Sequence, residues 1–174
     1  LYIKKGVKIG RFMHGGGQER GRRAGTENVA LAVGFSKAAE MILARRDHEQ
    51  RRLGDLKNTM KRMIEVKFPF VLFNGHPTES LPHILNISFD SNKIQIDGEA
   101  LLFNLDLAGV AVTSGSACTS GSIEPSHVLL AMGRTMKTAQ ATIRFSMGES
   151  TTPEGIQFAV DALEKVVERI GVRC

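Results

Sequence analysis

The stretch Ala141-Thr142-Ile143-Arg144-Phe145-Ser146-Met147 alternates apolar and polar residues throughout. Successive side chains of a β-strand point to opposite faces, so Ile143 and Phe145 should face a core while Arg144 lies on the other side. Such a strand needs neighbouring strands and a covering layer of helices. The flanking sequence predicts both.

Apolar residues spaced by three and four predict helices on either side of this strand. A long helix should begin at about Asn28, and its polar stretch between Ala44 and Arg52 either continues the helix or bends it. Its apolar stripe comprises Leu31, Phe35, Ala38, Ile42, Leu53, Leu56, Met60 and Met63. Shorter helices should follow Asp97 and Ser126, the second ending at Gly133, and a last helix should open at Pro153.

Short strands are expected at five further places, namely Leu1–Ile3, Val7–Ile9, Val71–Phe73, Ile84–Phe89 and Val110–Val112. The resulting order of elements predicts an α+β fold, in which a short sheet is covered by helices. With 42% hydrophobic residues the chain is able to build a core, but no apolar run approaches the ~20 residues that span a bilayer. No secretory signal is visible, and a start at Leu1 suggests a fragment with further sequence upstream.

The two cysteines, Cys118 and Cys174, form neither a disulfide framework nor a C-x-x-C metal pair. This pattern favours a reducing, cytoplasmic setting. The net charge of +5 comes largely from two groups of arginines, Arg20, Arg22 and Arg23, then Arg45, Arg46, Arg51 and Arg52. No aromatic residues interleave them, and carboxylates lie beside the second group. A solvated helix face therefore fits better than a nucleic-acid interface.

Cys118 lies in the stretch Ser114-Gly115-Ser116-Ala117-Cys118-Thr119-Ser120-Gly121, which holds no large apolar residue. The backbone of such a loop bends freely, so the thiol could reach a substrate and then move away. The alternative is an incidental surface cysteine, because thiol reactivity depends on surroundings that the loop sequence does not show.

The segment from His14 to Asn28 contains five glycines, which exclude regular structure for most of it. Its glycine spacing matches neither a dinucleotide-binding fingerprint nor a P-loop. Thr26 precedes the long helix and is expected to be its N-cap. A threonine at a helix N-terminus near arginines is either a plain cap or a phosphate site.

Three motifs, in the same order, resemble those of the pyridoxal-phosphate-dependent cysteine desulfurases of the class V aminotransferase family. The resemblance is to the group that supplies sulfur for iron–sulfur clusters and nitrogenase maturation. The motifs are the Cys118 loop with Glu124-Pro125-Ser126-His127-Val128-Leu129, the segment from His14 to Asn28, and Thr142-Ile143-Arg144-Phe145-Ser146. The resemblance covers essentially the whole chain, which corresponds to about the C-terminal half of a full-length member. It implies a fold-type-I aminotransferase, of which residues 26–174 form the small C-terminal domain and residues 1–25 a strip of the large cofactor domain.

The resemblance also implies roles for three residues. Cys118 would be the nucleophile that takes sulfur from L-cysteine as a persulfide and leaves L-alanine. Arg144 would bind the substrate carboxylate, although a surface ion pair is the alternative. Thr26 would donate to the cofactor phosphate of the neighbouring subunit, which implies a homodimer. No catalytic role is expected for the histidines; His127 would help to hold the helix after the loop.

In the family a lysine holds the cofactor in a Ser-x-His-Lys segment, and none of the lysines here has that context. The isolated chain is therefore expected to be inactive, with its cofactor lysine outside these residues. The expected partners are L-cysteine, a second copy of the protein and a sulfur acceptor or iron–sulfur scaffold protein, but not nucleic acid, a membrane or a metal. Two other functions remain open, a selenocysteine lyase and a non-catalytic sulfur-carrier or docking module.

Overall fold

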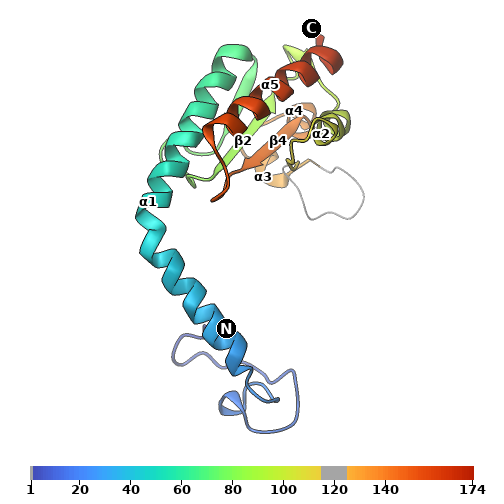
Figure 1. Cartoon of the computed structure of the whole chain (residues 1–174). Helices are drawn as coiled ribbons and strands as arrows, with labels where there is room; N and C mark the ends of the chain where they lie inside the picture. Colours follow the sequence, from blue (N-terminus) through green and yellow to red (C-terminus); the bar gives the residue numbers. More distant parts are fainter. Residues whose placement is uncertain (1, 115–124) are drawn as a thin grey trace. The chain divides into compact units, whose positions relative to one another are not determined.

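The computed structural model describes residues 2–114 and 125–174. They form two compact units, residues 1–46 and 47–174. The elements in chain order are η1 (Glu19–Gly21), α1 (Val29–Lys67), β1 (Val71–Asn74), β2 (Ile84–Phe89), β3 (Ile94–Gln95), α2 (Gly98–Leu107), α3 (His127–Ala131), α4 (Met136–Gln140), β4 (Thr142–Ser146), α5 (Pro153–Ile170) and β5 (Val172–Arg173). The α+β prediction is confirmed (Figure 1).

An antiparallel sheet with the strand order β1-β2-β4 lies at the centre of the second unit. Leu85 pairs with Phe145 and Ile87 pairs with Ile143, so the apolar positions of β2 and β4 share one face. The alternation predicted for residues 141–147 is therefore confirmed. A second, two-stranded sheet joins β3 to β5 near the C-terminus, and the sequence analysis predicted neither strand.

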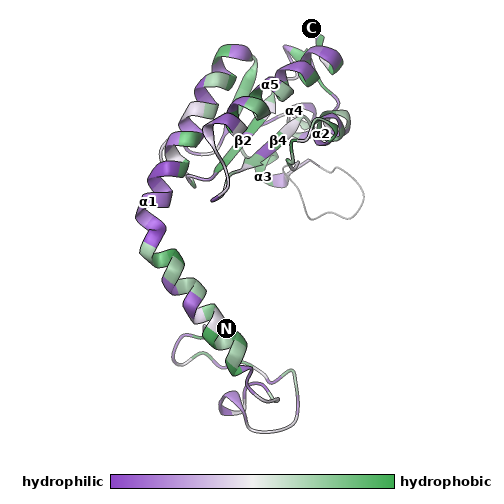
Figure 2. Cartoon of the chain, in the orientation of Figure 1, coloured by the Kyte–Doolittle hydropathy of each residue, from purple (hydrophilic) through white to green (hydrophobic). Residues whose placement is uncertain are grey.

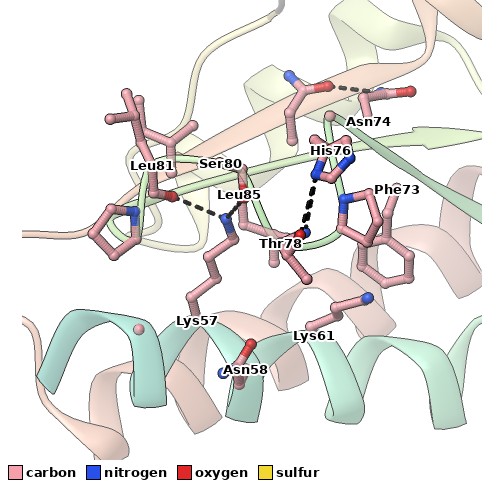
Figure 3. Close-up of a pocket in the computed structure, with 16 residues that line it drawn as sticks. Lys57, Asn58, Lys61, Phe73, Asn74, His76, Thr78, Ser80, Leu81 and Leu85 are labelled. Carbon is pink, nitrogen blue, oxygen red and sulfur yellow. Dashed lines mark hydrogen bonds between the residues drawn. The ribbon is translucent and has the colours of Figure 1, made fainter. Parts of the chain in front are cut away.

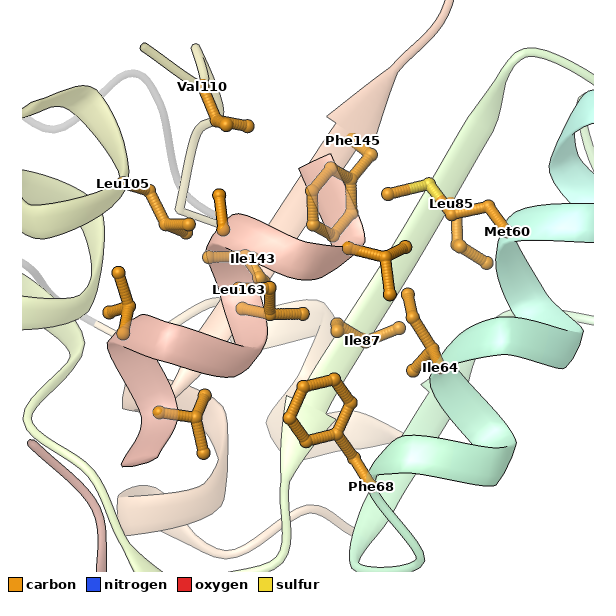
Figure 4. Packing of buried hydrophobic residues seen from close by; sticks show 14 of the residues in the cluster. Met60, Ile64, Phe68, Leu85, Ile87, Leu105, Val110, Ile143, Phe145 and Leu163 are labelled. Atoms are coloured by element: carbon orange, nitrogen blue, oxygen red, sulfur yellow. The ribbon is translucent and has the colours of Figure 1, made fainter. Parts of the chain in front are cut away.

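The hydrophobic core fills the space between this apolar face and the two long helices (Figure 4). Ile64 of α1, Ile87 of β2 and Leu163 of α5 are all fully buried. At the end of α1, Phe68 makes edge-to-face contacts with both Phe70 and Phe89, an arrangement that aromatic rings favour. The helix α2 packs beside α5 and buries Leu101 and Leu105 in the same core.

Polar contacts also tie α1 to the rest of the second unit. The Arg52 guanidinium donates to the carbonyl oxygens of Thr151 (2.8 Å) and Gly148 (3.0 Å), which precede α5. The same guanidinium binds Glu49 and thereby holds the pKa of that carboxyl below its usual value. At the C-terminal end of α1, Lys67 donates to Glu164 of α5, and this bond raises the pKa of the lysine.

The helix ends follow the predicted capping rules in most places. The Asp97 carboxylate accepts from the amides of Glu99 and Ala100, and the Thr152 hydroxyl accepts from Gly155 directly before Pro153. Gly133 follows α3 with φ of 83°, a left-handed conformation that glycine adopts without strain. The first helix differs from the expectation, because Asn28 and not Thr26 caps it, through a 3.0 Å bond from the Leu31 amide to Asn28 Oδ1.

The apolar stripe of α1 is buried in only one of its halves. Leu56, Met60 and Ile64 are buried, whereas Leu31 and Phe35 are 71% and 78% exposed. The apolar residues of the first half are visible on α1 in Figure 2. The polar stretch between Ala44 and Arg52 continues the helix without a break in its assignment.

Three predicted strands are wrong. Among the described residues, neither residues 2–3 nor Val7–Ile9 form a strand. The segment Val110–Val112 forms none either; a single antiparallel bridge joins the next residue, Thr113, to Arg144. No helix in the described part of the chain is both long enough and apolar enough to cross a membrane.

Replacing Leu163 by alanine should strongly destabilise the second unit. Leu163 is fully buried between α5 and the sheet, and removing such a side chain costs about 2–5 kcal/mol in the free energy of unfolding. Phe158→Ala on the same helix is the matched control, because Phe158 is 56% exposed and its loss should change the free energy by less than about 0.5 kcal/mol. Urea denaturation followed by circular dichroism measures both, and equal effects would contradict this description of the core.

Candidate functional site

The face of the sheet opposite the core carries a row of polar side chains. Asn74, Asn86 and Arg144 are aligned across β1, β2 and β4, and the bridge from Arg144 extends the row to Thr113. The row arises because side chains alternate between the two faces of each strand, so that the residues on either side of these positions face the core. It lies directly beside the chain that enters the Cys118 loop.

Arg144 is held in place through its backbone. Its amide donates to the Thr113 carbonyl oxygen at 2.8 Å, and its carbonyl oxygen accepts from the Thr113 amide at 3.3 Å. On the other side, Arg144 pairs with Asn86 in the β2–β4 register. The Cα position of Arg144 is therefore fixed by β2 on one side and by the bridge to Thr113 on the other, an arrangement suitable for holding a ligand in one orientation.

Two polar atoms in this row are buried without a hydrogen-bond partner, namely Arg144 Nε and Thr113 Oγ1. Nor does the Arg144 side chain form an ion pair with any carboxylate of the described residues, so a surface ion pair, the alternative reading of this arginine, is absent there. A buried polar group without a hydrogen-bond partner is less stable than the same group in water. The pair therefore marks a place where a further acceptor would be stabilised.

The rest of the row is satisfied internally. The Asn74 amide nitrogen donates to Asn86 Oδ1 at 2.7 Å, and its carbonyl oxygen accepts from Arg134 Nε at 2.8 Å. Arg134 also donates to the carbonyl oxygen of Phe73. The Asn86 oxygen is thus occupied as an acceptor, which leaves its NH₂ group as a donor next to Arg144 in the register. The sequence analysis missed these residues, although Asn86 and Ser88 interrupt the apolar strand at alternate positions and indicate a polar face.

Further along the same face, hydroxyl groups join the sheet to α4. Ser88 and Thr142 share a hydrogen bond of 2.6 Å between their oxygens, and Thr142 Oγ1 donates to the Thr138 carbonyl oxygen. The hydroxyl of Thr138 also contacts Ser91 Oγ at 2.9 Å. These contacts satisfy the buried hydroxyls and fix α4 against β2, close to the row that contains Arg144.

Cys118 lies outside the described residues. The structure describes the chain up to Ser114, one residue after the partner of Arg144, and again from Pro125. From there α3 begins at His127, which is exposed; Ser126 occupies the N-cap position but its hydroxyl makes no capping bond. The exposure of His127 gives no support to the packing role expected for it.

Thr26 lies in the first unit, in an exposed segment between the glycine-rich stretch and α1. Nearby, Arg23 donates to the carbonyl oxygen of Gly25 at 3.2 Å, and Glu19 and Arg20 adopt left-handed backbone conformations. No hydrogen bond of the Thr26 hydroxyl involves another described residue. Thr26 belongs to the first unit and Arg144 to the second. Among the described residues, no group of histidines, cysteines and carboxylates is arranged to hold a metal ion.

Comparison with known proteins relates this chain to one family. Residues 7–158 match the aminotransferase class-V family. The chain is 43% identical over 170 residues to the cysteine desulfurase IscS of Dictyoglomus turgidum, and 44% identical over 171 residues to that of Clostridium botulinum. These alignments cover 98% and 97% of this chain but 42% of each relative, so the chain spans less than half the length of these proteins.

Solved structures agree with the sequence matches. A NifS-like protein from Rickettsia africae superimposes with a TM-score of 0.78 at 27% identity, over 93% of this chain and 41% of the other. A second structure named as a NifS-like protein gives a TM-score of 0.79 at 30% identity, over 97% and 42%. The sequence and the fold therefore agree: this chain belongs to the aminotransferase class-V family, whose members include the cysteine desulfurases.

Proposed function

We propose that this chain is part of a cysteine desulfurase, which converts L-cysteine to L-alanine and holds the released sulfur on Cys118 as a persulfide. The observation that carries the proposal is the half-buried Arg144, whose Nε lacks a partner, paired through a strand bridge with the residue that leads into the Cys118 loop. The likeness to proteins named cysteine desulfurase supports it.

Arg144 supplies the group that binds the substrate carboxylate. A guanidinium is always charged and presents its donors in a planar fork that matches the two oxygens of a carboxylate. A carboxylate placed there would satisfy the Nε donor that is otherwise buried without a partner. The Thr113 hydroxyl and the Asn86 NH₂ group flank Arg144 in the register and are suitable as additional donors.

Cys118 supplies the sulfur acceptor. Five residue steps separate it from Thr113, which corresponds to a reach of at most about 18 Å for an extended chain. Within this reach the Cys118 thiolate is able to attack the sulfur of a cysteine held by Arg144. The S–S bond of the persulfide forms as the C–S bond of the substrate breaks. The outer sulfur is then passed to an acceptor protein, which leaves the Cys118 thiolate.

Pyridoxal phosphate is the cofactor of the proposed reaction. It supplies the electron withdrawal that allows the substrate's C–S bond to break. Within this chain the Thr26 hydroxyl is the group proposed to hold the cofactor phosphate, in a homodimer, from the neighbouring subunit. Its exposure and its lack of a partner among the described residues fit that role. The lysine that binds the cofactor is proposed to lie outside these 174 residues, with residues 1–25 belonging to the domain that contains it.

Replacing Cys118 by serine should abolish sulfide release in the full-length protein, because serine cannot form a persulfide. Cofactor absorbance and substrate binding should be unchanged, since Cys118 holds neither. Sulfide release and the visible spectrum measure the two properties separately, and Cys174→Ser, at the exposed C-terminus, is the matched control. Undiminished sulfide release from the Cys118→Ser protein would overturn the assignment.

Arg144→Ala should raise the KM for cysteine in the full-length protein by about one to two orders of magnitude, because a charge-assisted pair contributes about 1.5–3 kcal/mol. Thr113→Val keeps the shape of the side chain but removes its hydroxyl, and it should raise KM by a smaller factor. Arg173→Ala is the control, since Arg173 is an exposed arginine on β5. A KM that stays the same in Arg144→Ala would show that this arginine has only a structural role.

The purified 174-residue chain, mixed with pyridoxal phosphate and dialysed, should lose its yellow colour and release no sulfide from cysteine. The proposed reason is that no lysine of this chain has the surroundings that a stable Schiff base requires. Absorbance after dialysis and a sulfide assay provide the measurement. If the cofactor is retained and sulfide is released, the cofactor lysine lies within these residues.

A further inference from the structure

A cavity of about 560 Å³ lies between the second half of α1 and the loop that joins β1 to β2 (Figure 3). One wall is formed by Lys57, Asn58 and Lys61 of α1. The facing wall comprises Phe73 and Asn74 of β1, residues 75–78 and 80–82 of the loop, and Ile84–Asn86 of β2. Arg144 does not line this cavity, and no lining residue carries a carboxylate.

Lys57 reaches across this cavity to the loop. Its ammonium donates to the Ser80 hydroxyl at 2.7 Å and to the Leu81 carbonyl oxygen at 2.9 Å. Burial lowers the pKa of Lys57, and the positive charge of Lys61, one turn further along the helix, lowers it further. No described carboxylate forms an ion pair with Lys57, so its charge is partly desolvated without a counterion.

Lys61 and His76 add two more donors to the same walls. The ammonium of Lys61 lies 5.1 Å from the centre of the Phe73 ring and 3.7 Å from Glu65, which is not a lining residue. His76 Nδ1 accepts from the backbone amides of Glu79 (2.9 Å) and Thr78 (3.3 Å). Because that nitrogen is an acceptor, the proton of the neutral ring is on Nε2, which becomes a donor.

These groups select for a particular kind of ligand. Two ammonium groups, a ring N–H and several hydroxyl and amide donors exceed what the two oxygens of one carboxylate can satisfy. A phosphate monoester carries a charge of about −1.5 to −2 and three acceptor oxygens, so it would give Lys57 a counterion and would contact Lys61, which already pairs with Glu65 on its other side. The cavity falls within the usual range of about 300–1,000 Å³ for small-molecule sites, so it leaves space for an organic group against Phe73, Pro82 and Leu85.

We propose that this cavity binds an organic phosphate monoester, with Lys57 and Lys61 as the cationic contacts and His76 as an additional donor. The three residues proposed to contact the phosphate, Lys57, Lys61 and His76, have no role in the proposed desulfurase reaction. Asn86 lines this cavity and also lies beside Arg144 in the register. The cavity is formed entirely by residues of the second unit.

The proposal is tested by NMR titration of the full chain with phenyl phosphate, inorganic phosphate and benzoate. Phenyl phosphate should bind saturably, shift the signals of residues lining the cavity, and raise the pKa of Lys57, because an anion favours the charged ammonium. Its affinity should exceed that of inorganic phosphate and of benzoate by at least about tenfold. Equal affinity for inorganic phosphate or for benzoate would overturn the assignment to a phosphate monoester.

Lys57→Met and Lys61→Met should each weaken phenyl phosphate binding by at least about tenfold, since each removes a charge-assisted contact. Lys61→Met leaves the bonds from Lys57 to Ser80 and Leu81 in place, so its effect cannot come from loss of that tether. Lys165→Met is the control: Lys165 is exposed on α5, outside this cavity, and its loss should leave the affinity within about twofold. The absence of saturable binding, or equal affinity in all three variants, would overturn the proposal.

Discussion

The register between β2 and β4 is the constraint on which the rest of the structure depends. With Leu85 opposite Phe145 and Ile87 opposite Ile143, the apolar side chains of both strands face α1 and α5. A shift of either strand by one residue would turn its two apolar side chains away from the core and place polar ones inside it. Hydrophobic burial therefore selects one register, and that register also determines the opposite face.

On that opposite face the same pairing places Asn86 beside Arg144. The position of the proposed carboxylate-binding residue is thus a consequence of core packing on the other side of the strand. The bridge to Thr113 then ties the start of the Cys118 loop to Arg144. In the proposed reaction, Arg144 on the sheet would hold the substrate in place and the Cys118 thiol on a Ser/Gly-rich loop would carry the sulfur away.

The helix α1 contributes to the second unit in three ways. Leu56, Met60 and Ile64 bury its apolar side in the core. Arg52 and Lys67 connect it to the start and the middle of α5 through polar contacts. On another side, Lys57 and Lys61 line the cavity under the β1–β2 loop. The spacing of about one turn between these lysines places both on the same side of the helix, where burial and the charge of Lys61 lower the pKa of Lys57. An anionic ligand would oppose that effect.

Local sequence patterns were sufficient to predict β4, β2, the cap at Asp97, the start of α5 at Pro153 and the α+β class, because alternation and helix-start signals depend on neighbouring residues. Local patterns did not predict the outcome where two neighbouring residues were equally suitable or where a segment needed a partner from elsewhere in the chain. Thr26 and Asn28 are both suitable caps, and only the course of the backbone selected Asn28. Val110–Val112 has the composition of a strand, yet only Thr113 forms a bridge, since a strand also requires a partner at the correct distance.

By itself, then, the sequence determined the alternating faces of the strands, the apolar side of α5 and the presence of Arg144 on a polar face. These properties follow from the repeat of each element. Only the tertiary structure decided which polar groups on that face are satisfied by their neighbours and which remain free. It also decided that the apolar stripe of α1 is buried at Leu56 and Met60 but exposed at Leu31 and Phe35. The physical reason is that burial and hydrogen bonding depend on residues far apart in the chain, which periodicity within one segment does not reveal.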